Sequence, residues 1–184
     1  MLNKDNKALI QTTNEIALAY KNPDMTHNNV EKPRAHLTGT KQDYSSQQNQ
    51  TLQWEHYRGL AFTEFGMEYS NRSLHIPKTG YYYIYAQVSF RSVGYECSAN
   101  DQKASRKKFI SQMIAKINDN YPEPEVLLSG TKSLCEKESE MHHPIYLGAL
   151  LYMMEGDQIM VNVSDIKLVD VTVEHRTYFG AFLV

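Results

Sequence analysis

The side chains that could do chemistry are few and poorly spaced for catalysis. His142 and His143 are adjacent, so on a strand they would point to opposite faces, whereas a cupin-type oxygenase site needs a His-x-His pair with a later Glu. The sequence has neither a Gly-x-Ser-x-Gly motif nor a phosphate-binding glycine loop. It therefore predicts a protein that is not an enzyme, with no catalytic residue, no metal site and no cofactor.

The two cysteines, Cys97 and Cys135, lie in the polar, loop-like segments YECSAN and SLCEKES. A free thiol is more often buried in an apolar run, and no CxxC motif or nearby histidine gives these cysteines metal-ligand spacing. We therefore expect a disulfide between Cys97 and Cys135, with two unpaired thiols as the alternative. Closing this loop would stabilise the fold by about 4 kcal/mol in the chain-entropy description, less any strain.

Three Asn-x-Ser/Thr triplets are candidate N-glycosylation sites, at Asn49, Asn71 and Asn162. Asn49 lies in a polar stretch and Asn71 in an expected hairpin turn, while Asn162 alternates with apolar residues and should face solvent. Together with the cysteines, these triplets favour an extracellular, secreted protein. Because no signal-peptide pattern opens the chain, we expect a cleaved form or an excised ectodomain.

Composition narrows the possible partners. The chain has 184 residues and a net charge of −2, which gives no indication of nucleic-acid binding. The longest apolar run near the N-terminus is Ile16–Tyr20, much shorter than the roughly 20 residues that cross a bilayer, so no membrane segment is expected. Residues 1–32 are polar and broken at Pro23, and we interpret them as a flexible stalk in which a marginal helix could form.

From residue 33 to 184, short β-type runs alternate with Gly, Pro, Asn and Asp turn signals. This spacing is typical of an all-β, two-sheet antiparallel sandwich or barrel. The expected strands are RAHLTG, TLQWEH, LAFTE with GMEYS, SLHIP, YYYIYAQVSF, KFISQMIAKI, EVLLSGT, PIYLGALLYM, DQIMVNV and TYFGAFLV.

Three of these runs are apolar on both faces: GYYYIYAQVSF, PIYLGALLYM and TYFGAFLV. Parallel sheets covered by helices on both sides show this pattern, but no segment here has the length and periodicity of a crossover helix. A second copy of the chain is therefore the expected cover, and a thick single-chain core is the alternative. Tyrosine suits an interface, because it combines a large apolar area with a hydroxyl group that can reach a polar partner.

In order, the segments KPRAHL, LQW, IPKTGYYYIYAQVSF, LLSGTKSLC, PIYLGALLYMMEGDQIMVNVSD and TYFGAFLV resemble the tumour necrosis factor homology domain. The resemblance covers residues 33–184, and WEHYRGLAFT, NDNYPEP, GTKSLCE and NVSDIKLVD resemble one subgroup of that superfamily. It implies a jelly roll assembled as a homotrimer, with receptors bound in the grooves between subunits. It also implies a cytokine shed from a type II membrane precursor.

The resemblance also implies roles for individual residues. Three tyrosines match positions near the threefold axis: Tyr85, Tyr146 and Tyr178. Three residues match receptor-facing positions: Tyr121, Arg58 and Asp170. The alternatives are a tyrosine packed on its own loop and two ordinary solvated charges. The implied partners are a death-domain receptor of the TNF-receptor superfamily and a soluble decoy receptor, with cell death, costimulation or restraint of vessel growth as outcomes.

Two other binding classes share a sandwich fold. A complement-like globular trimer would normally follow a Gly-x-y collagen stem, which this sequence lacks. A carbohydrate-binding sandwich should run as a monomer in solution. Molecular mass therefore separates sugar binding from the cytokine hypothesis, and receptor binding separates the two kinds of trimer.

Overall fold

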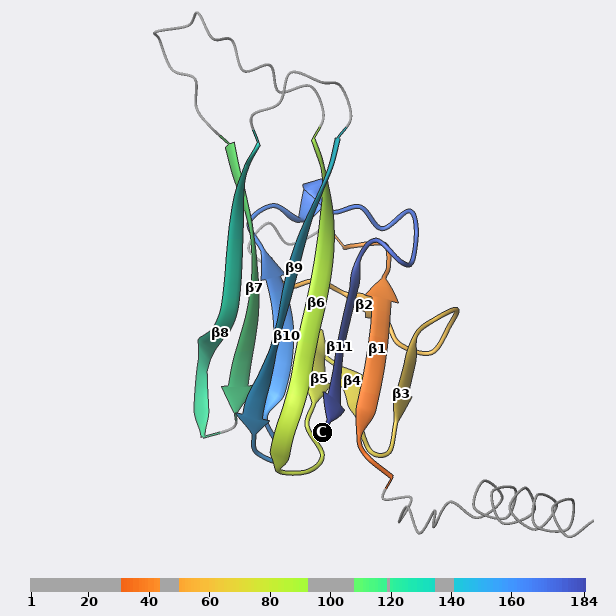
Figure 1. Ribbon diagram of the computed structural model, residues 1–184, viewed down its shortest axis with the longest axis vertical. Coiled ribbons are helices and arrows are strands. Elements are labelled where there is room, and N and C mark those ends of the chain that lie inside the picture. Colours follow the sequence, from red (N-terminus) through yellow and green to blue (C-terminus); the bar gives the residue numbers. More distant parts are fainter. Residues whose placement is uncertain (1–30, 44–49, 93–107, 119, 135–140) are drawn as a thin grey trace, which may run out of the picture. The chain divides into compact units, whose positions relative to one another are not determined.

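The computed structural model describes residues 31–43, 50–92, 108–118, 120–134 and 141–184 (Figure 1). The compact unit of the chain spans Lys32–Val184. The predicted stalk, residues 1–32, lies almost entirely outside the described residues.

The described residues form eleven strands and one short 3-10 helix, and every predicted strand segment overlaps at least one of these strands. The strands pair antiparallel throughout. The elements are β1 (Arg34–Gly39), β2 (Trp54–Glu55), β3 (Phe62–Glu64), β4 (Glu68–Ser70), β5 (Ser73–His75), β6 (Gly80–Ser92), β7 (Lys108–Asn118), β8 (Tyr121–Leu134), β9 (Met141–Met153), β10 (Gln158–Val163), η1 (Ile166–Leu168) and β11 (Tyr178–Leu183).

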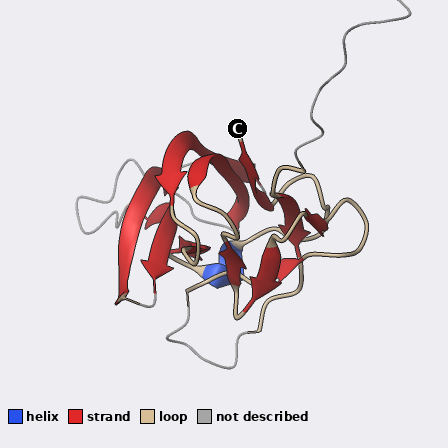
Figure 2. Ribbon diagram, turned by 90° about the horizontal axis from the view of Figure 1, so that it is seen from below, coloured by secondary structure: helices blue, strands red, loops and turns tan. Residues whose placement is uncertain are grey.

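Two sheets make up the fold, as the sequence predicts. The first sheet has the order β2-β1-β11-β6-β9, with β3 also paired to β1, and the second has the order β4-β5-β10-β7-β8. Viewed along the strands, the two layers enclose a common interior (Figure 2). The three strands that are apolar on both faces, β6, β9 and β11, lie side by side in the first sheet, so their second faces form one continuous surface.

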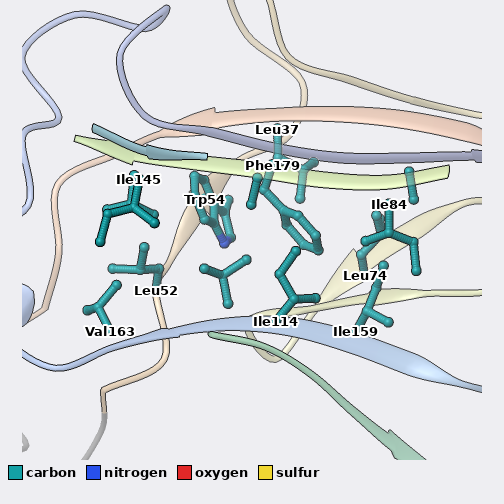
Figure 3. Close-up of a cluster of buried hydrophobic side chains, with 14 of the residues drawn as sticks. Leu37, Leu52, Trp54, Leu74, Ile84, Ile114, Ile145, Ile159, Val163 and Phe179 are labelled. Atoms are coloured by element: carbon teal, nitrogen blue, oxygen red, sulfur yellow. The ribbon is translucent and has the colours of Figure 1, made fainter. Parts of the chain in front are cut away.

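The interior is filled by the aliphatic and aromatic residues that alternate along both sheets. Ile84 and Phe179 from the first sheet lie toward Ile114 and Ile159 from the second (Figure 3), and all four side chains are fully buried. Removing a side chain of this size from water contributes roughly 1.5–3 kcal/mol. The core is thus supplied by one face of each sheet.

A buried amide links the two sheets across this core. Gln112 on β7 has no exposed surface. Its Oε1 accepts a hydrogen bond from the Val88 backbone N–H, and its Nε2 donates to the Ala86 carbonyl, both at 3.2 Å. Both groups of the amide are therefore satisfied on β6, as a buried polar side chain requires. Sequence reasoning did not single out this residue.

The hairpin turn predicted around Asn71 is present between β4 and β5. Ser70 pairs with Ser73, and the two intervening residues, Asn71 and Arg72, have φ values of 50° and 64°. Positive φ at both central residues matches the twist of a two-residue hairpin and suits asparagine. The exposed Asn71 side chain lies at the tip of this turn.

The Asn162 side chain is less exposed than the alternation of apolar and polar residues along β10 predicts. Its neighbours Val161 and Val163 are buried, as predicted. However, Thr51 forms a bridge beside Asn162, which leaves the side chain only half-exposed. Its Oδ1 is buried and has no hydrogen-bond partner among the described residues.

β8 begins earlier than the sequence predicts. The run EVLLSGT starts at Glu125, but the strand starts at Tyr121, which pairs with Asn118 across a tight turn. Pro122 and Pro124 lie in the added part of the strand, and neither has a backbone N–H to donate to a ladder. β8 is the edge strand of its sheet, however, and proline is tolerated on an edge, where one side of the backbone has no partner strand.

Candidate functional site

The outer face of the first sheet carries many of the large exposed apolar side chains of the described residues. Tyr81 and Tyr152 are cross-strand partners on β6 and β9, with 57% and 58% of their surface exposed. We call this surface the aromatic face. Its members are Phe62, Tyr81, Tyr83, Tyr85, Tyr146, Leu150, Tyr152, Tyr178 and Phe182.

The structure brings all three predicted axial tyrosines onto the aromatic face. The rings of Tyr85 and Tyr178 lie 6.2 Å apart between centroids. Tyr146 and Tyr178 both pair with Gln87 of β6, one from each side. The Tyr178 hydroxyl donates to the Gln87 Oε1 at 3.4 Å.

Two glycines make room for the tyrosine rings. A Cβ atom at Gly180 would collide with the Tyr85 hydroxyl, and one at Gly148 would lie 2.8 Å from the Tyr83 hydroxyl oxygen. Both glycines pair with Tyr85 of β6, and tyrosine side chains occupy the space where a Cβ atom would stand. The sequences LGAL and FGAF therefore place their glycines under aromatic rings.

Two hydroxyl groups of the aromatic face are paired with each other. The Tyr83 and Tyr146 hydroxyl oxygens lie 3.2 Å apart. This hydrogen bond, with some burial, raises the pKa of Tyr146 to about 12. The Tyr146 hydroxyl thus stays neutral at physiological pH, so it offers a polar group to water without adding charge to the surface.

His36 on β1 is a member of this site that sequence reasoning missed. Its Nδ1 lies 2.9 Å from the Tyr85 hydroxyl oxygen, and its ring lies 5.6 Å from Tyr178 and 6.3 Å from Phe62 between centroids. Burial lowers the pKa of His36. The available signal was its alternation with Ala35 and Leu37, which places His36 on the outer face.

Arg58 lies in a rigid, exposed turn between β2 and β3. The Ala61 N–H donates to the Arg58 carbonyl at 3.0 Å, and Gly59 has a φ of 63°, a conformation that favours glycine. The Leu60 N–H donates to the Glu174 carboxylate at 3.3 Å. The guanidinium carbon of Arg58 lies 5.1 Å from the Tyr57 ring centroid, so the charge remains accessible above an aromatic ring.

Asp170 is fully buried, whereas the resemblance implies a receptor-facing charge. Its Oδ1 accepts from both the Thr172 N–H and hydroxyl, at 3.0 and 2.6 Å, and its Oδ2 accepts from Arg176 at 2.8 Å. Burial alone would raise the pKa of Asp170, but these hydrogen bonds outweigh burial and lower the pKa to about 2. In this conformation the carboxylate holds its own loop and has no surface to offer a receptor.

His142 completes the surroundings of Asp170. Its Nδ1 lies 3.2 Å from Asp170 Oδ2, and its Nε2 lies 3.0 Å from an Arg176 nitrogen. Because a guanidinium group can only donate, Nε2 is the acceptor and Nδ1 carries the proton that faces Asp170. The pair of adjacent histidines is divided as the sequence predicts, since His142 is exposed and His143 is buried.

Several predicted site residues fall outside what the structure describes. Cys97, Cys135 and Asn49 lie outside the described residues. Tyr121 is placed by its backbone at the start of β8, but its side chain is not described. The disulfide, the glycan at Asn49 and the aromatic anchor at Tyr121 therefore stay predictions.

Within the described ranges, no group of three or more His, Cys, Asp or Glu side chains is arranged to hold a metal ion. Across the same ranges, no helix is long and apolar enough to span a bilayer.

Several proteins of the TNF type are similar in sequence to this chain. The chain is 47% identical over 158 residues to tumor necrosis factor ligand superfamily member 15 of Mus musculus, and the aligned stretch covers 83% of this chain and 63% of the mouse protein. The member 15 protein of Rattus norvegicus is also 47% identical, over 159 residues, covering 84% of this chain and 63% of the rat protein. Member 15 is vascular endothelial growth inhibitor, the type that the four subgroup segments resemble.

More distant relatives give the same family. Tumor necrosis factor of Cavia porcellus is 30% identical over 162 residues, which is 84% of this chain and 63% of the guinea pig protein. The chain thus spans less than two thirds of the length of these relatives. A profile of the TNF (Tumour Necrosis Factor) family matches residues 52–184, from just before β2 through β11. The chain therefore belongs to the TNF family.

Proposed function

We propose that this protein is an extracellular cytokine of the TNF type that acts as a homotrimer. It would bind TNF-receptor-superfamily members in the grooves between subunits and cluster them to trigger signalling. The observation that carries the proposal is the aromatic face, a continuous apolar surface on a strand set whose other face already fills the core. Family membership supplies the kind of assembly.

Trimer formation would cover this face. Soluble monomers rarely expose a contiguous apolar patch of more than a few hundred Å², and neighbouring side chains of three strands contribute here. A closed threefold assembly uses a heterologous interface, in which each residue meets a different residue of the next subunit. In this proposal Tyr85, Tyr146 and Tyr178 lie near the axis, and buried apolar area rather than ion pairing stabilises the trimer.

Replacing Tyr146 by Asp tests the assembly. A carboxylate in the middle of a buried apolar interface is costly unless it is paired, so we expect sedimentation of Tyr146→Asp to show monomer or aggregate. Glu68→Asp, an exposed position on β4 of the other sheet, is a control for handling and should remain trimeric. A Tyr146→Asp protein that sediments as the parent trimer would remove Tyr146 from the interface.

Receptor contacts would come from loops and strand ends at the subunit boundaries. We propose Tyr121 as the anchor and Arg58 as a charged contact, while the buried Asp170 acts by holding its loop. The expected receptors are a death-domain receptor and a soluble decoy receptor, and the outcome would be cell death, costimulation or restraint of endothelial growth. Three equivalent grooves would gather receptors in one membrane by avidity even where each contact is modest.

Binding to a panel of immobilised TNF-receptor ectodomains tests the receptor proposal. Tyr121→Ala should weaken each receptor contact by about 2 kcal/mol, the usual threshold of a hot spot, while light scattering still reports a trimer. An affinity within about twofold of the parent would remove Tyr121 as the anchor. A parent trimer that binds no ectodomain of the panel would contradict the receptor function.

An extracellular protein is expected to carry covalent marks of its passage through the secretory pathway. We propose release from a type II membrane precursor, a Cys97–Cys135 disulfide and N-glycans at one or more of Asn49, Asn71 and Asn162. Intact mass with and without reduction and alkylation decides the disulfide, because two alkylatable thiols in fresh unreduced protein would exclude it. Glycosidase treatment of protein from mammalian cells, followed by peptide mapping, decides the glycans.

A further inference from the structure

A cluster of basic side chains surrounds Asp170 at one end of the first sheet. Arg91 of β6 and His142 of β9 are cross-strand partners, and the Asp170 N–H donates to the Ser89 carbonyl at 2.7 Å. The segment between η1 and β11, drawn in blue, crosses this end of the sheet in Figure 1. Arg176 reaches back to the same carboxylate at 2.8 Å.

Positive charge exceeds negative charge in this cluster. Two guanidinium groups lie within 4 Å of a single carboxylate, Arg176 at 2.8 Å and Arg91 at 3.8 Å. The carboxylate is buried, whereas the Arg91 and Arg176 side chains are 49% and 37% exposed. What this end of the sheet presents to solvent is therefore basic, although the sequence resemblance places a negative charge there.

Both arginines keep unused donors. Arg176 uses one terminal nitrogen for both Asp170 and His142. At 3.8 Å, the Arg91 Nε is too far from Asp170 for a hydrogen bond. Among the described residues, no acceptor takes the remaining guanidinium N–H groups of either side chain. A guanidinium fork of this kind matches the two oxygens of a carboxylate.

We propose that Arg91 and Arg176 form a carboxylate-binding site for an acidic side chain of the receptor, with Asp170 fixing the arginines from beneath. The inference rests on the proposed receptor function and adds to it the chemistry of one contact. Asp170 is then a positioning residue.

The location of the cluster supports a protein carboxylate as the ligand. Arg91 and His142 continue the outer row of β6 and β9 beyond Tyr146, so the site borders the aromatic face. The same loop carries Glu174, which holds the turn of Arg58. The site thus lies between the proposed subunit interface and a proposed receptor-contacting turn. Two arginines around one buried carboxylate also form a small binding site, whose size suits a single acidic side chain.

The test compares charge variants of Arg91 in receptor binding. Arg91 is chosen because its 3.8 Å contact leaves the closer Arg176–Asp170 pair intact. Lys78→Glu is the matched control, since Lys78 is an exposed residue before β6, at the opposite end of that strand. Light scattering and thermal unfolding confirm that each variant remains a folded trimer.

We expect Arg91→Glu to weaken receptor binding about tenfold or more, mainly through a slower association rate, as is usual for charges at the rim of an interface. Arg91→Gln should bind the receptor about fivefold more weakly than the parent. In both variants the dependence of affinity on salt concentration should become less steep. Arg176→Lys keeps the charge but loses the planar fork, so it should lose affinity with little change in the salt dependence. Lys78→Glu should stay within about twofold of the parent.

Charge reversal on the receptor completes the experiment. Exchanging the acidic residues of the receptor one at a time for lysine should yield at least one variant that binds Arg91→Glu better than it binds the parent. If Arg91→Glu binds as Lys78→Glu does, the site is overturned while the receptor function stands. Loss of the trimer in Arg91→Glu would place Arg91 in the subunit interface and would also overturn the site. A parent that binds no receptor overturns the function itself.

Discussion

The two faces of the first sheet share the same strands and the same backbone, yet they are built differently. On the inner face, Ile84, Ala86 and Val88 have no exposed surface. On the outer face, Tyr81 and Tyr146 are each more than half exposed. The inner face uses mainly side chains without polar atoms, while the outer face uses tyrosines, several of whose hydroxyl groups pair with neighbours.

This difference separates two kinds of apolar surface. The core must be dry in every state that the folded protein visits, so the polar groups in it, such as those of Tyr82 and Gln112, bond to the backbone instead of water. A surface that is exposed in the single chain and covered in an assembly needs apolar area for association and polar groups for solubility, and tyrosine provides both. The paired hydroxyls of Tyr83 and Tyr146 meet both demands, since they remain satisfied when water leaves.

The largest effect should come from truncating a side chain of the inner face. Phe179 and Phe182 lie three residues apart on β11, the first fully buried and the second 43% exposed. Phe179→Ala should lower the free energy of unfolding by about 4 kcal/mol, through lost burial and the cavity left behind. Phe182→Ala should act mainly on association. Denaturant unfolding at two protein concentrations distinguishes these mechanisms, because only association makes the midpoint depend on concentration.

Equal losses of unfolding free energy in Phe179→Ala and Phe182→Ala, with no dependence on protein concentration, would contradict the distinction between the two faces. The outer face would then belong to the core of the single chain.

The next largest effect concerns the amide that joins the sheets. Gln112→Leu leaves the Val88 N–H and the Ala86 carbonyl without their buried partner, which should cost about 3 kcal/mol in unfolding free energy. Gln158→Leu, at a half-buried position on β10, is the matched control and should cost less than about 1 kcal/mol. Guanidinium unfolding of both variants measures the difference, and a Gln112→Leu protein as stable as the control would show that the link is dispensable.

Acid should remove the contribution of Asp170. Its pKa is lowered from 3.8 to about 2 in the folded chain, so the unfolded chain binds the proton more readily. Its stabilisation of about 2 kcal/mol is therefore present above pH 4 and is lost as the pH falls toward 2. Unfolding of parent and Asp170→Asn should differ most near pH 6 and least near pH 2. A difference in unfolding free energy between the parent and Asp170→Asn that does not change with pH would contradict this account.

The smallest effect should come from His36 on the outer face. Burial lowers its pKa, so the unfolded chain takes up a proton first as the pH falls below 6.5. The folded protein should therefore lose stability as the pH falls from 6.5 toward the lowered pKa of His36, and the loss should level off below that pKa. His36→Asn should remove this dependence between pH 7 and 5, measured by the thermal midpoint. A parent whose midpoint changes no more than that of His36→Asn over this range would exclude His36 as its source.

Much of the fold could be predicted from the sequence because apolar and polar residues alternate along the strands. Period-two patterns and turn residues locate the strands, and a pattern that is apolar on both faces identifies β6, β9 and β11. The start of β8 was missed because Pro122 and Pro124 forbid a central strand, and only the sheet order reveals that β8 is an edge. Gln112 was missed because a polar residue in an alternating strand is ordinarily placed on the solvent side.

Site residues could be predicted from the sequence where family motifs mark single positions, as for the tyrosines of the aromatic face. The burial of Asp170 was not predicted for a physical reason, since a charge in a polar loop segment is usually solvated. Besides its neighbours Thr172 and Arg176, its carboxylate also lies near Arg91 and His142, which are far from it in the chain and are brought together by the pairing of β6 with β9. Long-range charge pairing of this kind leaves no local pattern in one sequence.

The mass of the parent protein in solution tests the central claim most directly. If the aromatic face is a subunit interface, sedimentation equilibrium at micromolar concentration should give about 64 kDa before any glycan, three times the 21.2 kDa of one chain. A protein that remains at 21.2 kDa over the same concentrations, folded and free of aggregate, would contradict the account, because its aromatic face would then stay exposed to water.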